Sequence, residues 1–222
     1  MSLKKGCNCS QHESSPELPD DNDACPKPLL PWETLSAEEI YAAAPWIKLS
    51  VQRLRLPDGR VVDDYHQITL QDCVLIFAST GDGKIIMERQ YRHGVGKVTL
   101  ALPSGTVEVD EEPLAAAQRE LLEETGYKSK IWQSLGSFSM HGNYGCGRAH
   151  LFKASDAHRF TEPESGDLED MEIVTMTLDE IAQAVQESDI GLLGTMATIA
   201  LATNPLFAFL NTDSNESCES LK

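Results

Sequence analysis

Residues 105–127 read GTVEVDEEPLAAAQRELLEETGY, and this stretch predicts a helix with well-marked ends. Pro113 suits the first position of a helix, because its missing N–H is not needed there. Gly126 is the residue type best able to adopt the left-handed conformation that stops a helix. We therefore expect a helix from about Pro113 to just before Gly126, with Asp110 or Glu111 near its cap.

Three glutamates gather on this predicted helix. Glu120 and Glu124 are one turn apart, and Glu123 lies beside them. Like charges at this spacing destabilise a helix, and a local rule broken in this way often marks a functional site. Carboxylates on a rigid element suit Mg²⁺, with substrate phosphates completing its shell. A solvated acidic helix face is the alternative. An apolar stripe is expected to face a core: Leu114, Ala117 and Leu121.

The spacing of the polar residues matches a family signature. A glycine is followed by five residues, a glutamate, seven residues, and then Arg-Glu-aliphatic-any-Glu-Glu-any-Gly. The stretch resembles the Nudix box of hydrolases that split nucleoside diphosphates linked to another group. Tyr127 is the one departure, because an aliphatic residue is usual there. The positions that match are Gly105, Glu111, Arg119, Glu120, Glu123, Glu124 and Gly126.

The resemblance implies a metal site. Glu120 and Glu124 are similar in position to the principal metal ligands, and Glu123 adds to the cluster. The carbonyl of Ser104 is similar in position to a backbone ligand. The implied cofactor is Mg²⁺, with Mn²⁺ as a substitute.

The resemblance also implies a fold and a support for the site. The fold is an α/β class Nudix α/β/α sandwich with a mixed sheet, plus an N-terminal β-hairpin segment. Arg119 and Glu111 look like an ion pair that clamps the loop onto the helix. Gly105 is expected to give the loop its turn.

Flanking motifs narrow the substrate class. Residues 87–92, MERQYR, and 102–105, LPSG, resemble the ADP-ribose and ADP-sugar pyrophosphatases. The implied reaction cleaves an ADP-sugar to AMP and a sugar phosphate, with Arg89 and Arg92 binding substrate. For Arg92 a surface cation at a strand end is the alternative. Another NDP-sugar, a dinucleotide, or a catalytically silent nucleotide-binding regulator are the alternative functions.

The segment before the box resembles a dimerisation unit. The hairpin at 46–60 is similar to an N-terminal segment that pairs two subunits and helps to bind adenine across the dimer. We therefore expect a homodimer, with Trp46 and Tyr65 stacking on the base. A core aromatic is the alternative role of Trp46.

Two loops after the box carry further expectations. Many ADP-ribose enzymes have a proline in the first, but residues 140–147 read MHGNYGCG. This loop, with Asn143, either contacts the sugar or only connects a hairpin. In the second loop, 162–170, Glu169 is the first choice for a general base or late metal ligand and Asp167 the second. A solvated acidic loop is the alternative, in which case Glu123 becomes the better candidate for the base.

Composition and charge exclude some partners. The chain has 222 residues, 41% hydrophobic content and a formal net charge of −17. The charge argues against non-specific nucleic-acid binding, because phosphates would be repelled. Residues 191–210 lack charge over a length that could span a bilayer, yet Gly, Thr, Asn and Pro favour a buried helix over a membrane span. No membrane association is expected.

Six cysteines are scattered without a compact disulfide pattern or an apolar signal segment before them, which favours a reducing cytoplasm. The first three of these cysteines, together with His12, could bind zinc. Their spacing matches no common zinc site, which favours the alternative of a disordered tail. The cysteines are Cys7, Cys9, Cys25, Cys73, Cys146 and Cys218.

Four parts are expected along the chain. Residues 1–30 and 211–222 are predicted disordered tails. Residues 31–70 carry a helix and the hairpin, and 71–210 carry the hydrolase domain. Ser36 with Glu39 is a capping-box pattern, which predicts a short helix that ends by Pro45. The turn residues at 57–59, Pro-Asp-Gly, predict a hairpin of two strands at 46–56 and 60–69. Further strands are predicted at 74–78, 85–91, 131–140, 149–153 and 173–176, and a helix from Leu178.

Overall fold

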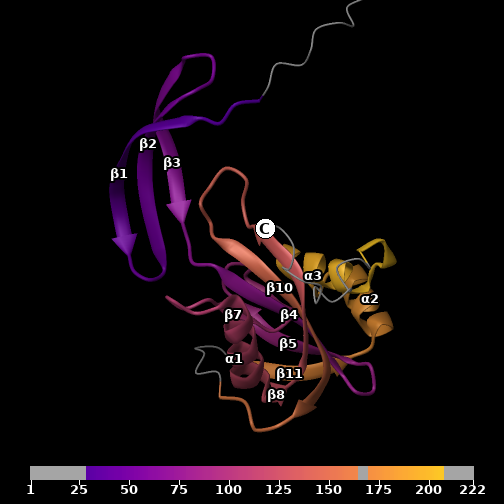
Figure 1. Ribbon diagram of the computed structural model, residues 1–222. Coiled ribbons are helices and arrows are strands. Elements are labelled where there is room, and N and C mark those ends of the chain that lie inside the picture. Colours follow the sequence, from indigo (N-terminus) through magenta and orange to yellow (C-terminus); the bar gives the residue numbers. More distant parts are fainter. Residues whose placement is uncertain (1–28, 165–169, 208–222) are drawn as a thin grey trace, which may run out of the picture.

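The computed structural model describes residues 29–164 and 170–207. Along the described chain, a first group of strands is followed by helix α1, then by a second group of strands and two further helices (Figure 1). The elements are β1 (Glu33–Ala43), β2 (Ile47–Arg55), β3 (Val61–Thr69), β4 (Cys73–Thr80), β5 (Ile85–Arg92), β6 (Lys97–Ala101), β7 (Ser104–Thr106), α1 (Pro113–Thr125), β8 (Tyr127–Lys128), β9 (Ile131–Ser139), β10 (Arg148–Arg159), β11 (Met171–Met176), α2 (Leu178–Gln186) and α3 (Leu193–Thr203).

The N-terminal part is an antiparallel sheet of three strands in the order β1-β2-β3, which stands beside the rest of the molecule in Figure 1. The hairpin of β2 and β3 confirms the prediction made from its turn residues. The short helix predicted from Ser36 and Glu39 is wrong, because both residues lie in β1. Main-chain pairing with β2, from Glu33 opposite Arg55 to Ala43 opposite Ile47, replaces the local helical bonds.

The second sheet is mixed. Its strands follow the order β11-β5-β4-β10-β8, with β6 on β5, β7 on β4 and β9 on β10. β4 and β10 pair in parallel, while β5 pairs antiparallel with β4, β6 and β11. The seven strands predicted from sequence are all present, most of them longer than expected.

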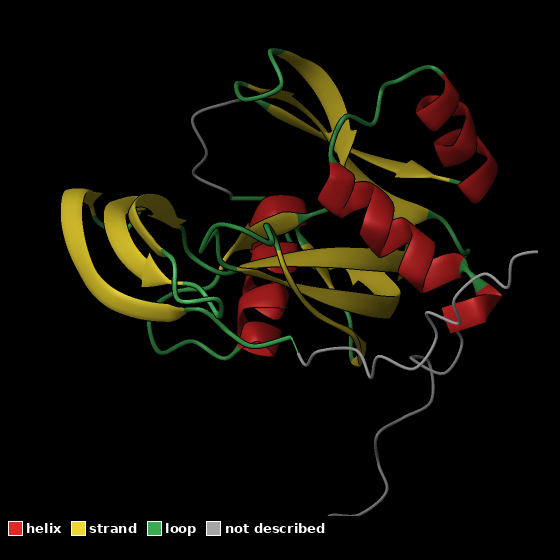
Figure 2. Cartoon of the chain, turned by 90° about the horizontal axis from the view of Figure 1, so that it is seen from above, coloured by secondary structure: helices red, strands yellow, loops and turns green. Residues whose placement is uncertain are grey.

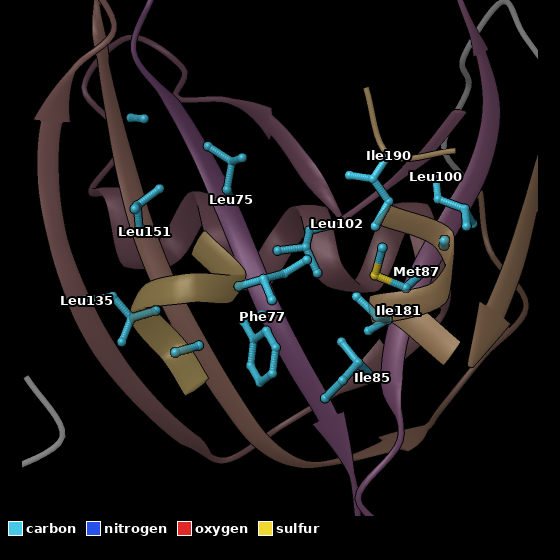
Figure 3. Close-up of a cluster of buried hydrophobic side chains, with 14 residues drawn as sticks. Leu75, Phe77, Ile85, Met87, Leu100, Leu102, Leu135, Leu151, Ile181 and Ile190 are labelled. Atoms are coloured by element: carbon cyan, nitrogen blue, oxygen red, sulfur yellow. The ribbon is translucent and has the colours of Figure 1, made fainter. Parts of the chain in front are cut away.

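Two apolar layers cover the two faces of this sheet, because successive side chains of a strand point to opposite faces. In β4, Val74 and Ile76 pack with Leu121 of α1. Leu75 and Phe77 point to the opposite face, where their cluster includes residues of α2 and α3. Figure 3 shows the second cluster, and Figure 2 shows helices on both sides of the strands. The predicted α/β/α sandwich with a mixed sheet is confirmed.

Helix α1 has the predicted ends with a different cap. Pro113 is its first residue, and Gly126 adopts a left-handed φ of 75° after its last. The N-cap is Glu112, without a side-chain cap bond, in place of Asp110 or Glu111. Ala117 and Leu121 are fully buried, but Leu114 remains 40% exposed, so the prediction that Leu114 faces the core is wrong. Leu114 lies in the first turn of the helix, where the sheet does not cover it.

The apolar segment near the C-terminus forms α3, which packs Ile199 and Ala202 against the same cluster as Leu75. In the residues described, no helix is both long and apolar enough to cross a membrane. The predicted buried helix is therefore present over Leu193–Thr203, shorter than the uncharged run that suggested it.

Candidate active site

The centre of the site is a close approach between β7 and α1. Gly105 pairs with Val74 of β4 and lies against Glu120 of α1. A Cβ at Gly105 would lie 2.0 Å from the carboxyl carbon of Glu120, so any side chain would displace the carboxylate or the strand. Gly105 is a strand residue without positive φ, which corrects the prediction that it forms a turn. Its missing side chain makes room for a carboxylate.

The box carboxylates differ in burial. Glu120 and Glu124 are 9% and 6% exposed, whereas Glu123 lies on the exposed face of α1. The N–H of Ser104 donates to Glu124 Oε2 at 3.0 Å, which ties the start of β7 to the helix. Burying ionised carboxylates is costly unless they are paired or bind a cation. This position beside β7 is therefore one that a positive charge would stabilise.

Arg119 holds the box together. Its guanidinium donates to both oxygens of Glu111, at 3.0 Å and 2.9 Å, so the ion pair expected from the sequence is present. It also donates to Glu120 at 2.8 Å, to Glu123 at 3.2 Å and to the Thr106 carbonyl at 3.0 Å. The Arg119 hydrogen bond holds the pKa of Glu111 below its ordinary value, and the same bond raises the pKa of Arg119.

The donor set fits a hard divalent cation. Glu120, Glu123, Glu124 and the Ser104 carbonyl supply oxygen atoms, the ligand type that such a cation prefers, and Glu120 and Glu124 lie against β7. Among residues 29–164 and 170–207, however, no three acidic, histidine or cysteine side chains are gathered closely enough to form a metal cluster. The contacts of Arg119 explain this, because two of the carboxylates turn toward its guanidinium.

Two regions of the chain match known protein families. Residues 69–193 match the model of the NUDIX domain. The chain belongs to the NUDIX family. Residues 32–68, which contain the three-stranded sheet, match the nucleoside diphosphate sugar hydrolase N-terminal domain. Nudix hydrolases generally use a divalent metal ion.

Relatives of this Nudix hydrolase have named activities. It is 31% identical to the methanol dehydrogenase activator of Bacillus methanolicus and 28% identical to the ADP-ribose pyrophosphatase of Bacillus subtilis. Each alignment covers 71% of this chain and 85% of the relative. The solved structure of an ADP compounds hydrolase has a TM-score of 0.70 and 21% identity, and the match covers 79% of this chain and 94% of that one. That structural likeness shows the shared fold.

The two arginines expected to bind substrate lie on opposite faces of β5. Arg92 shares the face of Ile86, which packs against α1, because alternate residues of a strand point the same way. Arg89 points to the other face, where it lies 3.5 Å from Glu172 and lines a cavity of about 260 Å³ beside α2. Within one chain the sheet therefore separates Arg89 from the box carboxylates.

The aromatic residues lie in the N-terminal sheet. Trp46 is 71% exposed at the turn between β1 and β2. The Tyr65 hydroxyl donates to the Asn143 carbonyl at 2.6 Å, and its ring meets Trp32 edge-on at 5.9 Å. The structure thus brings Tyr65 and Asn143 together through a contact that the sequence did not indicate.

The loop at 140–147 connects β9 and β10, which pair antiparallel, and it docks against the end of β3. Gly145 bridges to Thr69 and its carbonyl accepts the Leu70 N–H at 3.2 Å. At Gly147, φ is 73° and a Cβ would lie 2.3 Å from the Gln71 carbonyl oxygen. The loop therefore connects the two strands of a hairpin, as one of the two interpretations predicted. Contact with a sugar stays a prediction.

The two residues chosen for the general base, Asp167 and Glu169, lie outside the described residues. The segment that precedes them is anchored at the end of α1. The N–H of Glu164 donates to the Glu123 carbonyl at 2.8 Å, and the Gly126 carbonyl accepts two further N–H groups from this segment. No residue pattern predicts this anchoring, because it depends on main-chain groups.

Proposed function

We propose that this Nudix hydrolase cleaves the diphosphate of an ADP-sugar such as ADP-ribose, yielding AMP and a sugar phosphate such as ribose 5-phosphate. The observation that carries the proposal is the pair of buried carboxylates, Glu120 and Glu124, held against β7 beside Gly105. Relatives named ADP-ribose pyrophosphatase in Bacillus subtilis and Mycobacterium tuberculosis support the substrate class.

Glu120, Glu124, Glu123 and the Ser104 carbonyl would hold Mg²⁺, with Mn²⁺ as a substitute. When bound, the cation would neutralise charge on the diphosphate oxygens and position the attacking water and the leaving group. Arg119 and Glu111 keep the box loop on α1, and the hydrogen bond from Arg119 to the Thr106 carbonyl keeps β7 beside this helix.

Substrate binding is assigned to residues outside the helix. Arg92 lies on the α1 face of β5 and meets the diphosphate, and Trp46 and Tyr65 bind the base. Asn143 is assigned to the sugar. Arg89 lies on the far face of β5, so any contact it makes with substrate requires a second subunit.

Assembly as a homodimer completes the proposed site. A sheet of three strands is stable only when it has an apolar face to bury or packs against another element. The N-terminal sheet carries large exposed apolar side chains, which suit a second copy of the chain. Ile40 and Tyr41 of β1 are exposed by more than half, as are Trp32 just before β1 and Trp46 in the turn after it. We place this dimer in the cytoplasm, without nucleic-acid or membrane partners.

Glu169 is proposed as the general base, with Asp167 second. The anchoring of Glu164 on the Glu123 carbonyl supports a loop that begins close to the box. Changing each acidic residue of 162–170 to its amide tests this: Glu169→Gln should lower kcat about 10²–10⁴-fold with little change in KM. If no variant loses tenfold in kcat, the base lies elsewhere and Glu123 replaces it.

Two alternative functions differ from this one, the first in its substrate and the second in lacking catalysis. Another NDP-sugar or a dinucleotide would use the same box, and the substrate panel below separates them. A catalytically silent nucleotide-binding regulator is suggested by the relative named methanol dehydrogenase activator. The complete set of box residues, from Gly105 to Gly126, favours catalysis over silence.

The first experiment is a substrate panel with Mg²⁺. Chromatography of the products from ADP-ribose, ADP-glucose, GDP-mannose, NADH and dinucleoside polyphosphates measures which diphosphate is cleaved. The expected result is fastest turnover of ADP-ribose, with AMP and ribose 5-phosphate as products. Binding of these compounds without hydrolysis of any of them would support the regulator.

Glu124→Gln tests the box directly. The amide keeps the shape and an oxygen that accepts from Ser104, but it loses the charge that a cation needs, so activity should fall about 10²-fold or more. Glu112→Gln, an exposed change just before α1, is the matched control and should leave kcat unchanged. A folded Glu124→Gln enzyme with normal turnover removes Glu124 from the site.

A further inference from the structure

A row of three polar side chains, two of them buried, runs along β5 on the side of α1. Glu88, Gln90 and Arg92 alternate with residues of the other face, and they continue the line that begins at Ile86. Ile86 packs against α1, and Ile173, the partner of Glu88 on β11, packs against the same cluster. The row therefore lies on the face of the sheet that carries the box helix.

Glu88 is buried where an apolar residue would be expected. It is 0% exposed, as are its neighbours Ile86 and Met87, and its Oε2 lies 3.8 Å from Arg92 Nη2. A buried ion pair of this kind usually adds less stability than well-packed apolar side chains of similar size. Stability therefore gives no reason for a carboxylate at this position, whereas holding Arg92 in one orientation does.

Gln90 carries an acceptor without a partner. The residue is 2% exposed, and its Oε1 has no hydrogen-bond donor among the residues described. Thr99, directly opposite on β6, is equally buried, but its hydroxyl is bonded to the Asp189 carbonyl at 2.6 Å and to the Gly191 N–H at 3.0 Å. The described part of the fold thus provides hydrogen-bond partners for the Thr99 hydroxyl but no donor for Gln90 Oε1.

Arg92 has the same character. Its Nε is buried and has no acceptor in the part of the chain that the structure describes, although its side chain remains 32% exposed at the other end. An unmade hydrogen bond at a buried polar atom costs free energy. A ligand that brings both an acceptor for Arg92 and a donor for Gln90 would remove both costs.

We infer that Glu88, Gln90 and Arg92 form a substrate-recognition row: Gln90 accepts a hydrogen bond from a hydroxyl or amine of the nucleotide sugar, and Glu88 positions Arg92. This inference rests on the proposed function, because it needs a substrate that carries phosphate next to such a donor. Gln90 is a contact residue for the substrate, and Glu88 is a positioning residue that acts through Arg92.

Gln90→Leu tests the contact. Removing the open acceptor should raise KM for ADP-ribose about five- to tenfold with kcat little changed, while Tm stays the same or rises. Thr99→Val is the matched control, since it removes a satisfied buried hydroxyl from the opposite position and should lower Tm without changing KM. Gln90→Met, unbranched and of similar length, repeats the test if the leucine variant does not fold.

Calorimetry with the two products identifies the donor. AMP and ribose 5-phosphate are titrated separately into wild-type protein and Gln90→Leu with Mg²⁺. Weaker binding of AMP alone puts the donor on the nucleotide half, and weaker binding of ribose 5-phosphate alone puts it on the sugar half. Unchanged binding of both, with unchanged KM for ADP-ribose, overturns the contact.

A double-mutant cycle tests the positioning role of Glu88. Glu88→Gln should raise KM in the wild-type background and have no further effect when Arg92 is already alanine. Glu88→Asp should restore part of the lost affinity. A purely structural role predicts a lower Tm and the same KM change in both backgrounds, which would overturn the role.

Hydrolysis by the wild-type protein distinguishes an error in the recognition row from an error in the proposed function. If wild-type protein hydrolyses ADP-ribose and Gln90→Leu has the same KM, only the recognition row is wrong. If wild-type protein cleaves no nucleoside diphosphate sugar, the proposed function is wrong and the row is overturned with it.

Discussion

Gly105 sets the distance between β7 and α1, because its missing Cβ leaves room for the Glu120 carboxylate. Gly105→Ala would place a methyl group 2.0 Å from that carboxyl carbon, so the carboxylate or the strand must move. A displacement of about 1 Å at a catalytic site can cost about 10²-fold in rate. We expect kcat to fall by about that factor, measured with the best substrate of the panel.

Gly94→Ala is the control for this change. A Cβ at Gly94 meets no atom within 4 Å, and its φ lies outside the left-handed region. It should keep normal turnover. Equal kcat for both alanine variants would mean that the close approach of Gly105 to Glu120 does not serve the site.

The Glu111–Arg119 pair gives a prediction about pH. The Arg119 hydrogen bond lowers the pKa of Glu111 below the ordinary value of 4.5, so the folded state favours the charged carboxylate. Its contribution to stability is complete above pH 4.5 and is lost as pH falls through the lowered pKa. Glu111→Gln should therefore lower Tm at pH 7, and the difference from wild type should shrink at pH 3.

Circular dichroism melts of both proteins at these two pH values provide the measurement. A Tm difference of the same size at pH 3 and pH 7 would show that the charge of Glu111 is not what stabilises the loop.

At the scale of elements, two capping-box patterns had different outcomes. Thr177 and Glu180 form the reciprocal bonds at the start of α2, which buries Ile181 in the core. Ser36 and Glu39 have the same spacing, yet they lie in β1. The difference is the partner: α2 has an apolar stripe to bury, whereas β1 obtains its hydrogen bonds from β2.

The contact between β3 and the 140–147 loop joins the two sheets and can be tested. Tyr65→Phe removes the hydroxyl that donates to the Asn143 carbonyl, and it keeps the ring against Trp32. Because this bond is exposed, the loss of stability should be small, under about 1 kcal/mol. Hydrogen exchange should nevertheless speed up at the loop amides near Gly145. Tyr41→Phe, in β1 of the same sheet, is the control and should leave that exchange unchanged.

At the scale of the whole molecule, the uncovered N-terminal sheet predicts a dimer. Sedimentation should give twice the 24.4 kDa mass of one chain. Trp46→Ala should raise KM more than it lowers kcat, because stacking on a base contributes about 1–3 kcal/mol to binding. Trp46→Phe keeps an aromatic face and should restore most of the affinity. A monomer, or an unchanged KM in the alanine variant, would contradict the composite site.

The local chemistry of this protein follows from the order of its amino acids alone. Residues 105–127 predicted the helix, its ends and its carboxylates, and the turn residues at 57–59 predicted the β2–β3 hairpin. These features depend on neighbours along the chain, such as side chains one helical turn apart. Family membership also follows from this stretch, because its spacing is the signature itself.

Contacts between distant parts of the chain depend on the tertiary structure. It placed Gly105 in a strand against Glu120, turned the face of β5 that carries Arg92 toward α1, and buried Glu88 behind Arg92. No local pattern carries this information, since the order of strands in a sheet is set by packing of the two apolar layers. A one-residue change of register would move every side chain of β5 to the other face, so these contacts exist only once the sheet has formed.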